Sequence, residues 1–253
     1  MIPYGKQNIT EEDIQAVSKA LKGDFLTQGP TILEFEKAFA DYIGCKYAVA
    51  VSNGTAALHL STLALGVSKG QKIITTPITF AASANCVRYC DGEVVFSDID
   101  SKTYLLDVGK VEALLKAVPK GTYNGIIPVD FAGNAVNLEA FRKLADEYNL
   151  WIIEDACHAP GGYFIDSKGQ KQNCGNGNFA DLAIFSFHPV KHIATGEGGM
   201  ITTNDESLYK KLLELRTHGI TRDVNVFKNS NDFATGQRTS ENDNFPGWYM
   251  EMQ

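Results

Sequence analysis

Apolar positions in the first part of the chain recur at helical spacing. After the capping box Thr10-Glu-Glu-Asp13, an apolar residue returns every few positions as far as Leu21. A second amphipathic stretch runs over residues 32–42, and a glycine ends each pattern. We therefore predict two helices joined by a loop over residues 24–30, where no period is visible.

From residue 47 onward the pattern changes, because short apolar runs alternate with helical stretches. The runs predicted as strands are 47–51, 72–76, 93–96, 125–130, 150–153 and 182–185. The stretches predicted as helices are 56–65, 79 onward, 108–118, 138–148 and 208–216. Strands that alternate with helices indicate an α/β fold whose mostly parallel central sheet carries helices on both faces.

The last part of the chain follows neither pattern. Residues 221–244 form a polar run, and residues 245–253 read as the beginning of a further element. We therefore predict one large domain over residues 1–220 and a distinct segment over residues 221–253.

Composition limits what such a domain can do. With 253 residues, 44% of them hydrophobic and 21% charged, the chain suits one large α/β domain or two small ones. A formal net charge of −7 argues against nucleic acid and anionic membrane as partners, but leaves room for one phosphorylated ligand. No apolar run approaches membrane-spanning length and no signal peptide is visible, so we expect a cytoplasmic protein. The five scattered cysteines include no Cys-x-x-Cys pair, which favours reduced thiols.

Candidate chemistry is expected where the strands end, because ligands of parallel sheets bind beyond the carboxyl ends of the strands. The residues at those positions are Gly54, Thr55, Phe80, Asp130, Asp155 and Ser186. The strand, glycine turn and helix around Gly54 and Thr55 suit a phosphate, although an ordinary helix cap at Ser52 or Asn53 explains the same residues. Phe80 suits stacking on a planar ring, and equally a place in the core.

Lys191 and Asp155 carry the most informative chemistry. Lys191 follows a buried run and precedes the crowded glycines of Gly196-Glu-Gly-Gly199. A lysine desolvated among apolar and small residues is a Schiff-base nucleophile, whereas most lysines are simply exposed. Asp155 at a strand end can hold the protonated nitrogen of a pyridine ring, or merely cap a helix.

Three other patterns are weaker. Gly175-Asn-Gly-Asn-Phe-Ala180 matches a dinucleotide-binding pattern but follows a polar segment instead of a strand. Neither His188 with His192 nor Asp98 with Asp100 is expected to bind metal, because a proline breaks the first pair's helix and turn caps explain the second. No nucleotide-triphosphate loop of the Gly-Lys-Ser/Thr type is present.

Together these residues form the set that a pyridoxal phosphate enzyme requires: an amine, a partner for the ring nitrogen, a phosphate site and a ring cover. At the same residues the chain resembles the DegT/DnrJ/EryC1/StrS family of sugar aminotransferases. The matching segments are Ser52-Asn-Gly-Thr-Ala-Ala57, Thr76-Pro-Ile-Thr-Phe-Ala81, Glu154-Asp-Ala-Cys-His158, Ser186-Phe-His-Pro-Val-Lys191, Gly196-Glu-Gly-Gly199 and Leu215-Arg-Thr-His-Gly219. The Leu26-Thr-Gln-Gly29 segment is most similar to members that act in pseudaminic acid biosynthesis.

The resemblance implies a fold and an activity. The fold is the large domain of PLP-dependent transferase fold type I, the aspartate aminotransferase class. The activity is transfer of an amino group from glutamate to C4 of a UDP-4-keto-6-deoxy sugar by a cytoplasmic homodimer. The cofactor-binding residues implied are Gly54, Thr55, Phe80, Asp155, His158, Ser186 and Lys191, with Lys191 also catalytic. The substrate-binding residues implied are Tyr4, Asp24, Phe25, Leu26 and Thr27.

The resemblance also carries an expectation about the end of the chain. Relatives continue into a Gly-x-Asn-Tyr-Arg segment and a small C-terminal domain, and the asparagine reaches the partner's phosphate in the homodimer. This chain stops before that segment, so we expect the large domain alone, with weak cofactor retention and little activity by itself. Two alternatives stay open: a catalytically silent cofactor-binding protein, and a sugar dehydratase, which the presence of Lys191 disfavours because those relatives carry histidine there.

Overall fold

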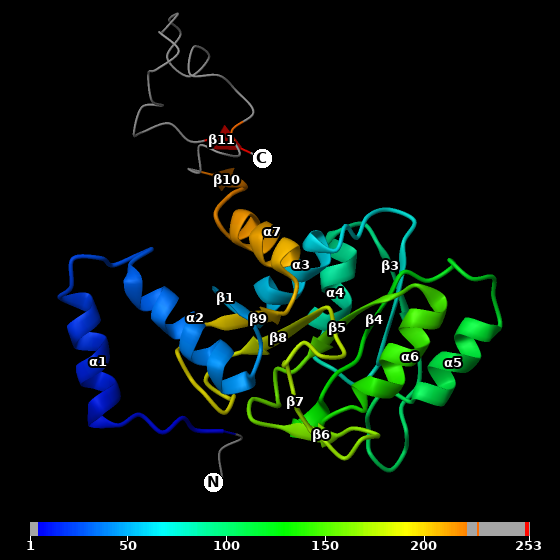
Figure 1. The fold of residues 1–253 in the computed structure, drawn as a ribbon. Helices are drawn as coiled ribbons and strands as arrows, with labels where there is room; N and C mark the ends of the chain where they lie inside the picture. The colour runs from blue at the N-terminus through cyan, green and yellow to red at the C-terminus, as the bar shows by residue number, and fades with distance from the viewer. Residues whose placement is uncertain (1–4, 222–226, 228–250, 253) are drawn as a thin grey trace, which may run out of the picture.

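The structure, a computed structural model, describes residues 5–221, 227 and 251–252 (Figure 1). The helices are α1 (Glu11–Leu21), α2 (Pro30–Ile43), α3 (Gly54–Ala64), α4 (Ala82–Tyr89), α5 (Val108–Lys116), α6 (Leu138–Tyr148) and α7 (Glu206–Arg216). The strands are β1 (Tyr47–Val51), β2 (Lys72–Thr75), β3 (Glu93–Phe96), β4 (Gly125–Ile127), β5 (Trp151–Asp155), β6 (Tyr163–Ile165), β7 (Lys171–Asn173), β8 (Leu182–Ser186), β9 (Gly199–Thr203), β10 (Ile220–Thr221) and β11 (Glu251–Met252). A 3₁₀ turn, η1, spans Phe131–Gly133.

A seven-stranded sheet in the order β1-β9-β8-β5-β4-β2-β3 forms the centre of the molecule. Strands β3, β2, β4, β5 and β8 pair in parallel, and β9 is antiparallel to both of its neighbours, β8 and β1. The predicted α/β fold with a mostly parallel sheet is therefore confirmed. Two further pairs, β6 with β7 and β10 with β11, lie outside this sheet.

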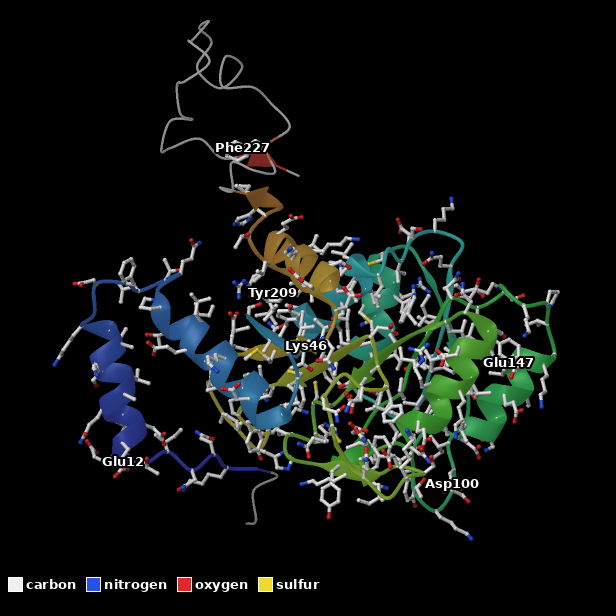
Figure 2. All side chains as sticks on the ribbon, viewed as in Figure 1. Glu12, Lys46, Asp100, Glu147, Tyr209 and Phe227 are labelled. Atoms are coloured by element: carbon white, nitrogen blue, oxygen red, sulfur yellow. The ribbon has the colours of Figure 1, made fainter. Side chains whose placement is uncertain are left out.

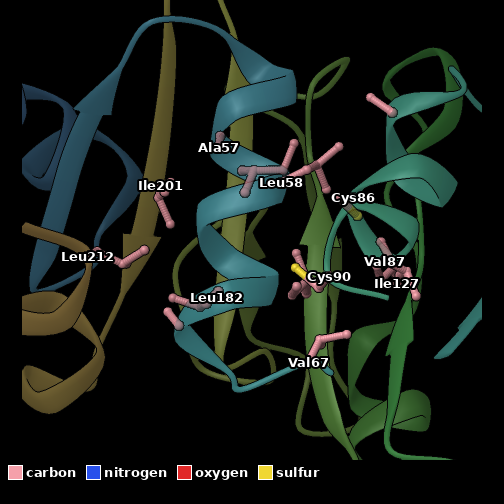
Figure 3. Close-up of a cluster of buried hydrophobic side chains, with 14 of the residues drawn as sticks. Ala57, Leu58, Val67, Cys86, Val87, Cys90, Ile127, Leu182, Ile201 and Leu212 are labelled. Atoms are coloured by element: carbon pink, nitrogen blue, oxygen red, sulfur yellow. The ribbon is translucent and has the colours of Figure 1, made fainter. Parts of the chain in front are cut away.

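Successive residues of the central strands face opposite sides of the sheet, and each side has its own helical cover. Ile153 of β5 packs with the core under α3, α4 and α7, where Leu58 and Leu212 meet the sheet (Figure 3). Its neighbour Ile152 packs on the other side with residues of α5 and α6. The uninterrupted apolar runs of these strands follow from this burial on both faces.

Helix α2 covers the remaining part of the second side through aromatic contacts. Phe39 meets Phe185 and Phe187 edge-on, with ring centroids 5.0 and 5.6 Å apart. Phe185 belongs to β8, and Phe187 is the first residue after it. Because both rings are fully buried, they fix the end of β8 from which the lysine-bearing segment departs.

Helix α1 stands apart from this core. It buries none of its residues, and its apolar positions Ile14, Val17 and Leu21 are at least half exposed. The helix, on which Glu12 is labelled, lies at the edge of the molecule apart from the sheet (Figure 2). No helix in the described part of the chain is long and apolar enough to cross a membrane.

Several predicted boundaries were wrong. Strand β9 and the hairpin β6–β7 were not predicted, and residues 171–173 before the dinucleotide-like segment are in fact a strand. Helix α4 begins at Ala82 instead of residue 79, so Phe80 precedes it. The predicted segment 221–253 lies almost wholly outside the described residues, as does Tyr4.

Candidate active site

A cavity of about 760 Å³ opens at the carboxyl ends of the parallel strands. It is bounded by the residues that follow β1, β2, β4, β5 and β8. All seven residues expected to bind the cofactor line it: Gly54, Thr55, Phe80, Asp155, His158, Ser186 and Lys191. Segments far apart in the sequence thus meet where the topology of a parallel sheet places a ligand.

Lys191 lies in the loop between β8 and β9, and hydrogen bonds fix this loop at both ends. The Phe187 amide donates to Gly198 O at 2.8 Å, and the Thr195 amide donates to Phe187 O at 2.9 Å. The Lys191 amide donates to His188 O at 2.8 Å, closing a tight turn. The half-buried Lys191 side chain is therefore presented to the cavity from a loop anchored on a buried phenylalanine.

The first turn of α3 forms a second wall of the cavity. Asn53 caps the helix, because its Oδ1 accepts from the Ala56 amide at 2.8 Å. Gly54 and Thr55 occupy the turn in which helix amides have no intrahelical partner, and both line the cavity. The helix dipole and these amides favour an anion such as a phosphate at this position.

Close backbone approach explains two glycines around this turn. A Cβ on Gly199, the first residue of β9, would lie 2.5 Å from Asn53 C and 2.6 Å from Asn53 O. A Cβ on Gly54 would lie 2.9 Å from Ser186 Cβ. The turn before α3 is therefore wedged between the end of β8 and the start of β9, which holds the Ser186 hydroxyl against it.

Asp155 ends β5 and is only 4% exposed. Its Oδ2 accepts from the Ser83 hydroxyl at 2.7 Å, and its Oδ1 accepts from the Cys157 amide at 3.2 Å. Both partners donate, as a carboxylate requires. Burial raises the pKa of the adjacent Cys157 thiol well above its ordinary value, so this thiol stays protonated at neutral pH.

His158 lies across the cavity and is half-buried. Its Nδ1 accepts a hydrogen bond from the Ala132 amide at 3.2 Å. Burial, with a smaller contribution from the Lys191 charge, lowers the pKa of the imidazole from its ordinary 6.5. His158 is therefore neutral at pH 7.

Phe80 and the predicted substrate residues are exposed. Phe80 is 72% exposed at the rim of the cavity, so the alternative that places it in the core is wrong. Residues 24–27, between α1 and α2, are exposed and are not part of the cavity wall. Their role in substrate binding, and that of Tyr4 outside the described residues, stays a prediction.

Ser83 is a site residue that the sequence reasoning missed. It is fully buried, its hydroxyl donates to Asp155, and Thr79 Oγ1 lies 2.7 Å from its Oγ. The sequence did contain a signal for it, because Ser83 shares the apolar face of α4 with Ala82, Cys86 and Val87. A hydroxyl on such a face needs a buried partner. Phe131 was missed too, since it follows the short β4 within an irregular turn that carries no pattern.

Comparison with known proteins decides the family. The model of the DegT/DnrJ/EryC1/StrS aminotransferase family matches residues 7–242, nearly the whole chain. The chain belongs to this family. A Campylobacter jejuni member, UDP-4-amino-4,6-dideoxy-N-acetyl-beta-L-altrosamine transaminase, is 45% identical over 223 residues, which are 88% of this chain and 56% of that protein.

Solved structures share the fold of this chain. A Helicobacter pylori aminotransferase involved in the biosynthesis of pseudoaminic acid superposes with a TM-score of 0.77 at 32% identity, covering 89% of this chain and 58% of that one. A Bacillus subtilis protein, solved with bound cofactor PMP, superposes with a TM-score of 0.74 at 30% identity, covering 88% of this chain and 49% of that one. The chain thus spans about half the length of the relatives it matches.

Proposed function

We propose that this protein is a pyridoxal phosphate-dependent aminotransferase that converts a UDP-linked 4-keto-6-deoxy-N-acetylhexosamine into the 4-amino sugar, with glutamate as amino donor. One observation carries the proposal: Lys191, Asp155 and the first turn of α3 line the same cavity. An amine, a carboxylate and an anion site are the three contacts that the cofactor needs.

The residues fit the cofactor on chemical grounds. Asp155 already accepts two hydrogen bonds and has no cation bonded to it among the described residues, so this buried carboxylate can accept a further hydrogen bond from a protonated ring nitrogen and keep the proton on the ring. Gly54, Thr55 and Ser186 gather at one end of the cavity and would bind the phosphate. When bound, the cofactor supplies an aldehyde that takes up the amino group and a ring that withdraws electrons from the reacting carbon.

The chain's own residues then position this group and move protons. Lys191 Nζ would bind the cofactor aldehyde and afterwards carry a proton between cofactor and sugar carbons. His158 Nε2 would flank the ring beside its 3-hydroxyl, and Phe80 would cover a face of the ring from the rim. Residues 24–27 would lie against the sugar nucleotide.

The names of relatives support the choice of sugar acceptor. The Campylobacter jejuni protein is named for a UDP-4-amino-4,6-dideoxy sugar, and a solved relative acts in the biosynthesis of pseudoaminic acid. These names support a UDP-4-keto sugar as acceptor for the present protein. The proposal also includes a cytoplasmic homodimer, which light scattering of the full-length protein would test.

Cofactor binding can be tested by absorbance. The full-length protein mixed with pyridoxal phosphate should gain a visible band that is lost in Lys191→Ala and kept in Lys46→Ala, which removes an exposed lysine far from the cavity. Glutamate should then shift the band. An unchanged spectrum after glutamate would contradict transamination and favour a silent cofactor-binding protein.

The sugar can be identified from the product. Candidate UDP-4-keto sugars incubated with the full-length protein and glutamate should yield a UDP-4-amino sugar, whose C4 configuration NMR reports. Loss of the 4-keto sugar without amine at C4 would instead indicate a dehydratase.

A further inference from the structure

A pair of buried carboxylates lies directly behind the cavity. Asp130 follows β4, Glu154 precedes Asp155 in β5, and their side chains are 0% and 1% exposed. One oxygen of each has a backbone donor: Val136 N lies 2.8 Å from Asp130 Oδ1, and Gly175 N lies 2.8 Å from Glu154 Oε2. Asp130 Oδ2 is buried and has no hydrogen-bond partner in the described part of the chain.

These two carboxylates and one thiol form a close cluster. Polar atoms of Asp130, Glu154 and Cys174 all lie within 4.8 Å of one another. Burial raises the pKa of both carboxyl groups, and their mutual repulsion adds to the effect at Glu154. Burial also raises the pKa of Cys174, so its sulfur stays protonated and is a poor metal ligand. A single proton between the two acids satisfies the unpartnered oxygen without a metal ion.

Asp130 connects this cluster to the turn that follows it. Its Oδ1 holds the Val136 amide, and its backbone oxygen accepts from the Gly133 amide at 3.1 Å. Within this turn Ala132 has a φ of 54°, in the left-handed region that a residue with a Cβ seldom adopts. Such a conformation persists only where its surroundings impose it, and the Asp130 contacts do so here.

The turn around Ala132 determines which ring nitrogen of His158 carries the proton. The strained Ala132 points its N–H at His158 Nδ1, 3.2 Å away. A ring nitrogen that accepts a hydrogen bond carries no proton, so the neutral imidazole must carry its proton on Nε2. The titratable groups that act on this ring are Lys191 and His192, which lower the pKa of His158, and Asp155, which raises it but less strongly than burial lowers it.

We propose that Asp130 and Glu154 share one proton and act as positioning residues, fixing the turn that holds His158 as an Nε2–H donor facing the cavity. The proposal rests on the proposed function at one point only, the identity of the group that accepts the hydrogen bond from Nε2–H. This acceptor would be an anionic oxygen of the cofactor or substrate. The tautomer itself belongs to the protein without ligand and can be measured there.

The shared proton has its own readout. Infrared spectra of the full-length, cofactor-free protein at neutral pH should contain a protonated-carboxyl band that disappears in both Asp130→Asn and Glu154→Gln. Each amide can donate where the proton lay, so both variants should fold. A band that persists in both variants, or is missing from the wild type, would overturn the sharing of a proton.

The tautomer is read from nitrogen-15 spectra. Long-range ¹H–¹⁵N correlations of the cofactor-free protein, assigned with His158→Gln, should report Nε2–H in the wild type and in Asp130→Asn, which keeps the acceptor for Val136. Asp130→Ala should lose this preference and give a mixture. Asp98→Ala, which removes an exposed carboxylate paired with Lys110, should leave the signals unchanged.

The outcomes separate this inference from the proposed function. An Nδ1–H tautomer in the wild type refutes the inference even if the enzyme transaminates. Unchanged Nε2–H signals in Asp130→Ala refute the positioning role, and if that variant does not fold, the wild-type tautomer and the infrared band still test the inference. A correct tautomer in a protein that never transaminates sustains the inference and removes only the proposed function.

Discussion

Helices α1 and α3 are built from similar local signals and have opposite fates. Each has 11 residues and a side-chain N-cap, from Thr10 in α1 and from Asn53 in α3. Yet α3 buries six residues between the sheet and its neighbours, whereas α1 buries none. Capping and periodicity therefore tell where a helix forms, and only tertiary packing tells what it supports.

The two helices also differ in their distance from the cavity. The start of α3 belongs to the cavity, and Gly199 and Ser186 press against it from two strands. At the start of α1, the hydrogen bonds between described residues stay within the helix and its capping box, with Thr10 N 2.8 Å from Asp13 Oδ2. Matched substitutions in the two regions test how far this contrast holds.

The largest contrast should appear between two lysines. Lys191→Ala should reduce transamination roughly 10³-fold or more, because the covalent nucleophile is lost. Lys19→Ala, in the last turn of α1, should leave kcat/KM within about twofold, since no described contact ties this exposed side chain to the cavity. Steady-state kinetics with glutamate and the keto sugar measure both, and comparable losses would abolish the distinction between the regions.

Two leucines test the contrast in packing. Leu58→Ala in α3 removes a side chain that is 1% exposed and should lower the free energy of unfolding by about 2–5 kcal/mol. Leu21→Ala in α1 removes one that is 67% exposed and should change it by about 0.5 kcal/mol or less. Urea titrations followed by circular dichroism give both values. A loss above about 1 kcal/mol at Leu21 would mean that α1's apolar face is covered in solution.

An acid of the core, Asp130, and an acid of α1, Asp13, should make the free energy of unfolding depend on pH in opposite directions. Burial raises the pKa of Asp130 from an ordinary 3.8 to about 6, so the folded state holds this proton more tightly than the unfolded state. The resulting stability is complete below about pH 4 and is lost as the pH rises through about 6. Hydrogen bonds from the Thr10 backbone and hydroxyl lower the pKa of Asp13, whose contribution is instead lost as the pH falls below its ordinary value.

Unfolding curves between pH 3 and pH 8 measure this difference. Asp130→Asn should flatten the decline above about pH 4 that the wild type shows. Asp13→Asn should alter only the acid end, and by less, because its carboxylate is exposed. Parallel curves for the wild type and Asp130→Asn across this range would contradict a raised pKa at Asp130.

The smallest contrast concerns the helix caps. Asn53→Ala should lower the global free energy of unfolding by about 1 kcal/mol, because α3 is part of the cooperative core. Thr10→Ala removes an equivalent cap but should melt α1 locally, leaving the global transition unchanged. Hydrogen exchange distinguishes the two, with faster exchange confined to α1 in Thr10→Ala.

Much of this architecture could be predicted because its signals are local. Apolar runs such as Leu150–Ile153 and caps such as Asn53 mark their elements directly, and the rule for parallel sheets places the ligand at the strand ends. Strand β9 escaped prediction because Gly-Met-Ile-Thr-Thr carries no run or alternation. Its two threonines are buried, and their hydroxyls donate hydrogen bonds to Gly175 O and Asp181 O, partners that only the tertiary structure supplies.

The residues of the site also fall into two groups, those that could be predicted from the sequence and those that could not. Residues at the end of a strand or in the loop that follows it, such as Asp155 and Lys191, could be selected from the sequence, and the cavity brings them together. Ser83, and the pairing of Asp130 with Glu154, depend on side chains from different elements meeting in the interior. No spacing along the chain encodes such meetings.

The position of β9 late in the sequence also means that the cavity is completed late during translation. Among the strands that the structure describes, β1 pairs only with β9, with Tyr47 opposite Thr203 and Val51 opposite Gly199. At about 5–20 residues per second, a nascent β1 waits on the order of ten seconds for that partner to be translated. A chain halted between residues 187 and 198 would already carry β8, but the turn before α3 would lack the strand that wedges it in place. The end of the cavity formed by the first turn of α3 is therefore completed last.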